Sequence, residues 1–379
     1  MASAAKVHAW EISSIKAFAE SKGDYVIPST YHSMTESHDD VADELADSIP
    51  VIDLSLLTSK DPEIHAKAVS ELGKACAEWG FIMVSIRVDA SRVSYITVSV
   101  SFLLAYTLRN HGIPEKLMEE LMNKAVEFHY LPVEEKMEFD DKGKSHNSPI
   151  RYGTSFNPHA EKVHYWRDYL KVITSPEFNF PNKPPGYRDL AFDYCRKIRS
   201  VGRKLLEGIS ESLGLESNSI IESTGYDSGF QTFVANFYPP CPQPHLAQGM
   251  PSHSDHGLMT FLIQNGIGGL QIKHDGKWIN VNPLPNSLPV ILGDHLEVVS
   301  NGRYPGVIHR AILNNQDNRI SLVVGNGPAL DKQIGPVPEL LSENEKPLFK
   351  GITFNQYFRV QQNTPLADKS TLDAIRLNA

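Results

Sequence analysis

The chain has 379 residues, of which 41% are hydrophobic and 21% charged, as is ordinary for a globular protein. Its formal net charge is −9, and the sequence lacks the clustered Lys and Arg of a nucleic-acid-binding surface, so we expect no nucleic-acid partner. The chain has three cysteines without CxxC spacing, which predicts no disulfide framework. We find no secretory signal and no apolar run of about 20 residues, so we expect a cytoplasmic protein without membrane contact.

The first half of the chain is mainly helical by its pattern. Residues 1–48 are polar and mixed, which predicts a loosely attached arm. A short buried strand follows within residues 48–55. Asp61 is typical of an N-cap and Pro62 of a first turn, and they predict a helix that ends at Gly80. Apolar residues at helical spacing predict two more helices, at residues 114–132 and 187–215.

The second half changes to short runs rich in β-branched residues from Phe230 onward. Asp275 and Gly276 separate two such runs and predict a hairpin turn. Pro289 removes a backbone donor, which predicts an edge or bulged strand. Regularly spaced short strands indicate a β sandwich or barrel. We therefore divide the chain into a mainly helical N-terminal region, 1–215, and a β core with a helical tail, 216–379.

Two histidines and one aspartate are the candidate metal ligands. His253 and Asp255 are two residues apart in "PSHSDHG", a spacing that puts both side chains on one face of a strand. His309 lies in a later strand-like run, "GVIHRAILN". Two imidazoles and one carboxylate form the facial ligand set of non-haem Fe(II). A zinc site and a purely structural histidine–aspartate pair are the alternatives.

A candidate carboxylate-binding site follows ten residues later. Arg319 and Ser321 alternate in "RIS", so a guanidinium and a hydroxyl share one strand face and suit a bidentate carboxylate. Asn236 and Tyr238 in "NFYPPCP" are placed in the same way on another strand. The alternative for Arg319 is an arginine at a strand edge that pairs with a surface acid. The alternative for Tyr238 is a tyrosine buried in the core.

These motifs resemble the plant-type 2-oxoglutarate/Fe(II)-dependent dioxygenases. The resemblance runs from "IPVIDLS" to "FNQYF" and includes, in the family's order, "WGF", "NHGIP", "LPVEEK", "YGTSFN", "WRDYL", "NFYPPCPQP", "SHSDHGLMT", "GGLQI", "GKWINVNPLPNS", "GDHLEVVSNGRY", "VIHRA" and "RIS". It implies a mixed, mainly β fold: a distorted double-stranded β-helix, or jelly-roll, with surrounding α-helices.

The resemblance also implies cofactors and ligands for this chain. Fe(II) would bind His253, Asp255 and His309. The co-substrate 2-oxoglutarate would chelate the metal and place its far carboxylate on Arg319 and Ser321, with Tyr238 and Asn236 lining the same pocket. Dioxygen is the second co-substrate, and ascorbate is expected as a reductant.

The implied activity is hydroxylation, desaturation or demethylation of a small hydrophobic specialised metabolite or hormone, with release of succinate and CO2, by a monomer. A family member or mis-spliced form that binds ligand without turnover is one alternative. A zinc hydrolase is another, although it leaves Arg319 and Ser321 unexplained. Gly325 stands where many flavonoid-acting relatives carry a phenylalanine that stacks on the substrate, so a flavonoid substrate does not follow from the resemblance.

One segment departs from the family pattern. In the resembling family one or so residues join the "WGF" strand to "NHGIP", whereas 25 residues separate Val84 from Asn110 here. Residues 86–109 hold few charges, no helix cap and no ligand candidates. We interpret this insert as translated non-coding sequence, such as a retained intron of in-frame length or a gene-model error. A lid over the site and a membrane-contacting hairpin are the alternatives.

Overall fold

The computed structural model describes residues 12–21, 26–33, 41–85, 111–140, 148–155, 161–284, 287–364, 366 and 370–377. Its α-helices are α1 Ile15–Ser21, α2 Pro62–Trp79, α4 Glu115–His129, α5 Val133–Met137, α6 Tyr187–Ser212, α7 Ser219–Thr224, α8 Asp294–Val299, α9 Phe354–Asn363 and α10 Ser370–Asp373. Its 3-10 helices are η2 Ser29–Tyr31, η3 Asp43–Ser48, η4 Leu56–Thr58, η7 Tyr226–Ser228 and η8 Pro338–Leu340.

The strands form two main sheets. The large sheet has the order β1-β2-β10-β7-β12-β5-β4-β3 and the small sheet the order β6-β11-β8-β9, while β13 and β14 pair separately. The strands are β1 Val51–Asp53, β2 Phe81–Ser85, β3 Ile150–Gly153, β4 Asp168–Ser175, β5 Gln231–Tyr238, β6 Met250–His253, β7 Met259–Gln264, β8 Leu270–His274, β9 Lys277–Val281, β10 Leu288–Leu292, β11 His309–Ala311, β12 Arg319–Asn326, β13 Gln333–Ile334 and β14 Ile352–Thr353.

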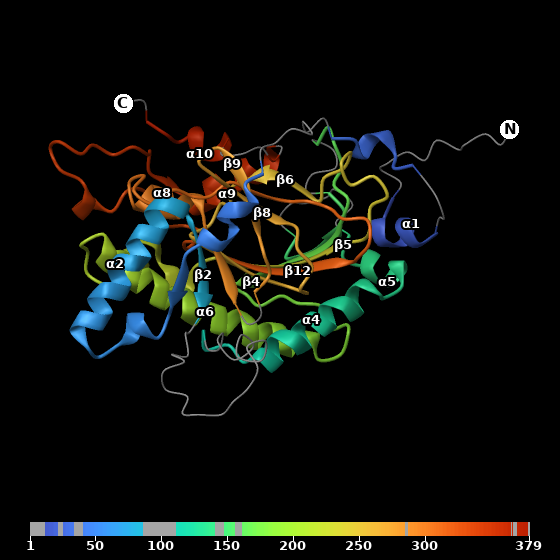
Figure 1. Cartoon of the computed structure of the whole chain (residues 1–379), viewed down its shortest axis with the longest axis horizontal. Coiled ribbons are helices and arrows are strands. Elements are labelled where there is room, and N and C mark those ends of the chain that lie inside the picture. The colour runs from blue at the N-terminus through green and yellow to red at the C-terminus, as the bar shows by residue number, and fades with distance from the viewer. Residues whose placement is uncertain are drawn as a thin grey trace.

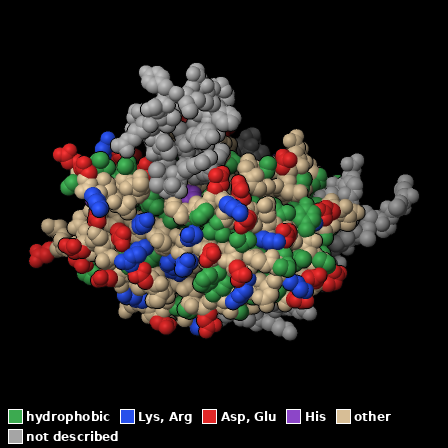
Figure 2. All heavy atoms as spheres, turned by 90° about the horizontal axis from the view of Figure 1, so that it is seen from below, with side chains coloured by type: hydrophobic (Ala, Val, Ile, Leu, Met, Phe, Trp, Pro, Cys, Tyr) green, Lys and Arg blue, Asp and Glu red, His purple; other side chains and the backbone are tan. Residues whose placement is uncertain are grey.

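Two long helices, α4 and α6, cover one side of the large sheet (Figure 1). Figure 1 shows α4 and α6 along that side and the small sheet on the other. Seen from the helical side, acidic and basic side chains are interspersed among hydrophobic ones (Figure 2). Among the described helices, none has the length and apolarity required to cross a bilayer. The space between the two sheets is therefore the place where a buried ligand site can form.

Local sequence signals set the helix ends as predicted. The Asp61 side chain accepts hydrogen bonds from the backbone N–H groups of Glu63 and Ile64, at 2.9 and 3.3 Å, and so caps α2. Gly80 ends α2 with φ 60°, where a Cβ would lie 2.5 Å from the Pro305 carbonyl oxygen. The predicted hairpin is confirmed as well: Asp275 and Gly276, with φ 48° and 79°, join β8 to β9.

Two sequence-based expectations were wrong. Pro289 lies on β10, an interior strand between β2 and β7. Pro289 pairs with Met83 of β2, whereas the pairing of β10 with β7 begins only at Val290. Pro289 therefore lies beyond the end of the β10–β7 ladder, where its missing N–H costs no hydrogen bond to β7. The N-terminal arm is also not loose over its described residues. Ser14 Oγ and Ile15 N each donate to the buried Asp168 carboxylate at 2.6 Å, and Ile15 is itself buried.

The division at residue 215 stays a prediction. The large sheet takes β1 to β4 from before that residue and its other strands from after it. The proposed insert, residues 86–109, lies outside the described residues. The described segments on its two sides pack into one hydrophobic cluster, which contains Val84 from β2 and Ile113, Met118 and Leu121 from around α4.

Deleting residues 86–109 is expected to give a more soluble protein with a higher midpoint of thermal unfolding and equal or higher oxygenase activity. The flanking segments already share a core, and an apolar insert adds an aggregation liability. Thermal unfolding, the soluble yield and succinate formation of the two proteins would test this. A deletion protein that is less stable or inactive, beside a full chain that turns over, would show that the insert is a genuine element.

Candidate active site

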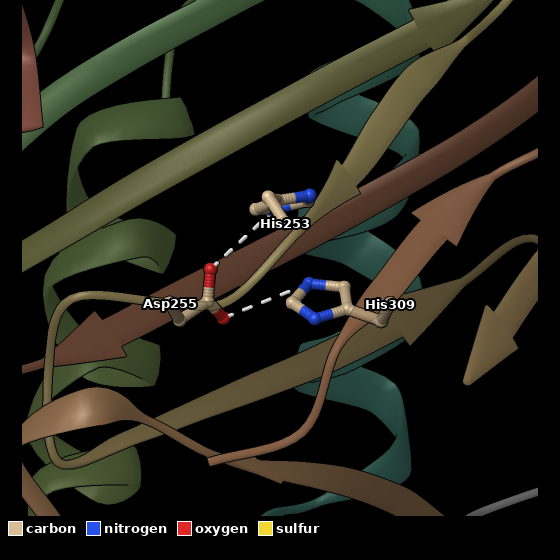
Figure 3. Close-up of side chains that lie close together, drawn as sticks. All are labelled: His253, Asp255 and His309. Atoms are coloured by element: carbon tan, nitrogen blue, oxygen red, sulfur yellow. Dashed lines mark ion pairs between the residues drawn. The ribbon is translucent and has the colours of Figure 1, made fainter. Parts of the chain in front are cut away.

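The three candidate metal ligands meet where β6 and β11 pair (Figure 3). His253 ends β6, and His309 begins β11 as its direct antiparallel partner. Asp255 lies in the loop beyond β6 rather than on the strand, so the chain turn, not strand alternation, brings it to the histidines. The ligand atoms of the three side chains all lie within 4.8 Å of one another.

Backbone carbonyl groups orient both imidazoles. His253 Nδ1 lies 2.8 Å from the Pro251 carbonyl oxygen, and His309 Nδ1 lies 3.3 Å from that of Val307. The Nε2 atoms therefore face the carboxylate, at 3.7 Å from Asp255 Oδ1 for His253 and 3.8 Å from Oδ2 for His309. A bond from the second ring nitrogen to a carbonyl is the usual way to hold a metal-binding histidine.

The protonation states suit metal binding. Burial, followed by the neighbouring His309, lowers the pKa of His253 to about 4, so its imidazole is neutral at neutral pH and keeps a lone pair for a metal. Burial opposes ionisation of Asp255, but His309, His253 and the Thr260 hydroxyl outweigh it and hold the pKa of this carboxyl below its usual value. Asp255 is therefore a carboxylate.

The three side chains fit a metal ion. Asp255 Oδ2 is buried and has no hydrogen-bond partner among the described residues, which is costly for a carboxylate oxygen unless a cation satisfies it. The cluster is also the single group of metal-ligand type found in the described part of the chain. Two nitrogen ligands and one carboxylate oxygen, with room for further ligands, match a facial Fe(II) site.

The candidate carboxylate site lies in the same cavity, on the large sheet. Strands β12 and β5 place Arg319 opposite Tyr238 and Ser321 opposite Asn236. The Asn236 Nδ2 donates to Ser321 Oγ at 3.3 Å, and the Arg319 guanidinium lies 5.0 Å from the Tyr238 ring centre. All four predicted residues therefore lie on one wall of the cavity that the candidate metal ligands also line.

Arg319 has unused donors. Its side chain is only 2% exposed, and Nη2 donates to Gln264 Oε1 at 3.0 Å. Its Nε and Nη1 have no hydrogen-bond partner among the described residues. A buried guanidinium with free donors needs an anion, and a carboxylate matches its planar fork. The predicted alternative, an edge arginine paired with a surface acid, does not describe this position.

Three cations that line the cavity had not been predicted, namely Arg151, Arg167 and Lys171, and neither had Gln264, which accepts a hydrogen bond from Arg319. Arg167 and Lys171 lie in "WRDYLK" and Arg151 in "RYG". Their alternation along a strand was a usable signal. These side chains line the cavity because β3, β4 and β5 pair with one another. This pairing could not be predicted from the sequence.

Comparison with known proteins identifies the family. A sequence model of the 2OG-Fe(II) oxygenase superfamily matches residues 229–328, and one described as "non-haem dioxygenase in morphine synthesis N-terminal" matches residues 105–190. The 2-oxoglutarate-dependent dioxygenase 19 of Oryza sativa subsp. japonica is 40% identical over 330 residues, which cover 87% of this chain and 90% of that one. Flavanone 3-dioxygenase 2 of the same organism is 35% identical, with 86% and 87% covered.

A solved structure agrees with these relatives. The crystal structure of JOX2 in complex with 2OG, Fe and JA has a TM-score of 0.80 and 28% identity, and covers 97% of this chain and 98% of that one. The predicted jelly-roll core with surrounding helices is thereby confirmed. This chain belongs to the 2OG-Fe(II) oxygenase superfamily, as a dioxygenase that uses Fe(II) and 2-oxoglutarate.

Proposed function

We propose that this dioxygenase oxidises a C–H bond of a small organic metabolite, with His253, Asp255 and His309 as the iron ligands. In a hydroxylation, one atom of O2 enters the product and the other enters succinate, while 2-oxoglutarate loses CO2. The single observation that carries this proposal is the buried Arg319, whose Nε and Nη1 lack partners among the described residues, in the cavity that holds the candidate metal ligands.

Each group of residues has a task in this proposal. The three ligands occupy one face of the iron and leave positions for 2-oxoglutarate and O2. Arg319 and Ser321 hold the far carboxylate of 2-oxoglutarate, while Asn236 fixes the Ser321 hydroxyl and Tyr238 flanks the guanidinium. Bound iron supplies the activation of O2. The cavity walls place the substrate and exclude water, which is the protein's usual contribution to cofactor chemistry.

The substrate is a small molecule in this proposal, because the cavity lies between two sheets and is lined by both. We propose further that the enzyme acts as a cytoplasmic monomer without a nucleic-acid partner. The rice relative is named for flavanone, but Gly325 leaves this wall of the cavity without a side chain. A Cβ at that position would lie 3.1 Å from Thr232 Oγ1.

Turnover with defined metals tests the proposal. Metal-free protein is supplied with Fe(II), ascorbate, 2-oxoglutarate and O2, and succinate is measured against parallel samples with Zn(II). We expect succinate only with iron and O2, at a low rate that rises when a substrate is present. Hydrolysis of an ester or amide probe by the zinc-loaded protein, with no succinate from the iron-loaded protein, would favour the hydrolase alternative. Iron and 2-oxoglutarate binding without any succinate would favour the alternative that binds ligand without turnover.

A further inference from the structure

A chain of hydrogen bonds links Arg167 to the candidate carboxylate site. Arg167 Nη1 donates to Asn236 Oδ1 at 2.7 Å, and Asn236 Nδ2 donates to Ser321 Oγ at 3.3 Å. The three side chains are between 1% and 5% exposed, and they line the cavity that also holds Arg319. Hydrogen bonds between buried groups are stronger than those in water, so this chain can hold the three groups in one arrangement.

Strand pairing places the three residues in line across the large sheet. Asn236 on β5 is the direct partner of Ser321 on β12 and of Tyr169 on β4, and these strands are neighbours in the order β12-β5-β4. Arg167 lies two residues before Tyr169, with its guanidinium 4.9 Å from the Tyr169 ring centre. The sheet itself therefore sets the positions of these side chains.

The segment that carries Arg167 is fixed by contacts outside the cavity. The next residue, Asp168, is buried and is not part of the cavity lining. Its carboxylate accepts hydrogen bonds from Ser14 Oγ and Ile15 N at 2.6 Å, and from Tyr152 Oη at 3.0 Å. A residue on a backbone that is held in this way keeps the geometry of its own hydrogen bonds, as a binding site requires.

The chemistry of arginine fixes the direction of each hydrogen bond in this chain. A guanidinium can only donate, so the Asn236 atom that faces Arg167 is the carbonyl oxygen. The Asn236 amide nitrogen then faces Ser321 and also can only donate, so Ser321 Oγ accepts. The one hydrogen of the Ser321 hydroxyl is thereby left for a different acceptor, and a carboxylate is such an acceptor.

We propose that Arg167 is a positioning residue for 2-oxoglutarate, because it fixes, through Asn236, the direction in which the Ser321 hydroxyl donates. This inference rests on the proposed function, in which Arg319 and Ser321 hold the far carboxylate. Without the guanidinium, the Asn236 amide can turn over and accept the Ser321 hydrogen through Oδ1. The hydroxyl would then present a lone pair, instead of a hydrogen, to the carboxylate.

A double-mutant cycle between Arg167 and Ser321 tests the proposal. Calorimetry measures the binding of 2-oxoglutarate to the full chain loaded with Mn(II), for Arg167→Met, Ser321→Ala and the double variant. Ser321→Ala should weaken binding about 10- to 100-fold, the range for one charge-assisted hydrogen bond. Arg167→Met should weaken binding at least about 5-fold by itself but less than about 2-fold in the Ser321→Ala background, because both changes remove the same bond.

Asn236→Asp is a second, independent variant, which keeps the size of the side chain and an acceptor for Arg167. A carboxylate can only accept, so it takes the Ser321 hydrogen away from 2-oxoglutarate and also adds a negative charge. The charge acts with or without Ser321, whereas the lost hydrogen matters only when Ser321 is present. Asn236→Asp should therefore weaken binding by a larger factor in the wild-type background than in the Ser321→Ala background.

Arg188→Met is the matched control for Arg167→Met. Arg188 is a half-buried arginine that donates to the carbonyl oxygens of Phe180 and Phe178 at 2.9 and 3.1 Å, and it is not part of the cavity lining. The control loses structural hydrogen bonds of the same kind, but it should leave the binding of 2-oxoglutarate unchanged.

Several results would overturn the proposal. They are unchanged binding in Arg167→Met or in Ser321→Ala, equal losses in Arg167→Met and the Arg188→Met control, and independent losses at Arg167 and Ser321. If Arg167→Met does not fold, Asn236→Asp decides alone, and equal factors in its two backgrounds would reject the role of Arg167. A wild-type chain that carries Mn(II) but does not bind 2-oxoglutarate would show instead that the proposed function itself has failed.

Discussion

Asp255→Asn is expected to abolish iron binding and succinate formation. The change keeps the size of the side chain but removes the single negative charge of the ligand set, and it leaves two neutral imidazoles to hold a divalent ion. Loss of residues that merely support a metal ligand costs about 10- to 100-fold, so loss of a ligand should lower activity by more than about 100-fold. Iron per chain and succinate per minute are the two measurements.

The chain offers a matched control for this variant. Asp275→Asn makes the same chemical change in the exposed β8–β9 turn. The backbone there has φ 48°, which asparagine tolerates well. This control should keep both iron and activity. Full activity of a metal-analysed Asp255→Asn protein would remove Asp255 from the iron site.

Arg319→Lys is the second large effect that we expect. Lysine keeps the charge but loses the planar fork that grips a carboxylate at two points. Removing one charge-assisted hydrogen bond costs about 1.5–3 kcal/mol, which corresponds to an apparent KM for 2-oxoglutarate raised about 10- to 100-fold. The apparent KM for the substrate that is oxidised should change far less. Initial rates of succinate release against each concentration provide both constants.

Arg303→Lys is the control for Arg319→Lys, because Arg303 pairs with Glu345 on the surface at 2.9 Å. It should leave both constants unchanged. Equal increases in the two constants for Arg319→Lys would mean that this residue does not hold 2-oxoglutarate selectively.

Features governed by neighbouring residues could be predicted from the sequence. The N-cap at Asp61, the left-handed Gly80 and the Asp275–Gly276 turn depend on backbone chemistry within a few residues. The shared strand face of Arg319 and Ser321 follows from strand alternation in the same way. Local patterns predicted only a β sandwich or barrel. The resemblance to the family predicted the jelly-roll.

Features governed by distant pairing could not be predicted. The contact of Asp168 with Ser14 joins residues 154 positions apart, so the arm was wrongly expected to be loose. The interior position of Pro289 depends on which strands flank β10. The opposition of Arg151 and Lys171 depends on the β3–β4 register. Each of these depends on how distant segments pack or pair, which no local pattern encodes.

Titration of the iron-loaded chain with 2-oxoglutarate under argon tests the central claim most directly, namely that the three ligands and Arg319 form one site for metal and co-substrate. The account predicts one 2-oxoglutarate bound per iron-loaded chain, with much weaker binding once the metal is removed, since chelation then no longer contributes. Absence of binding to the iron-loaded chain, or equal affinity with and without iron, would contradict it.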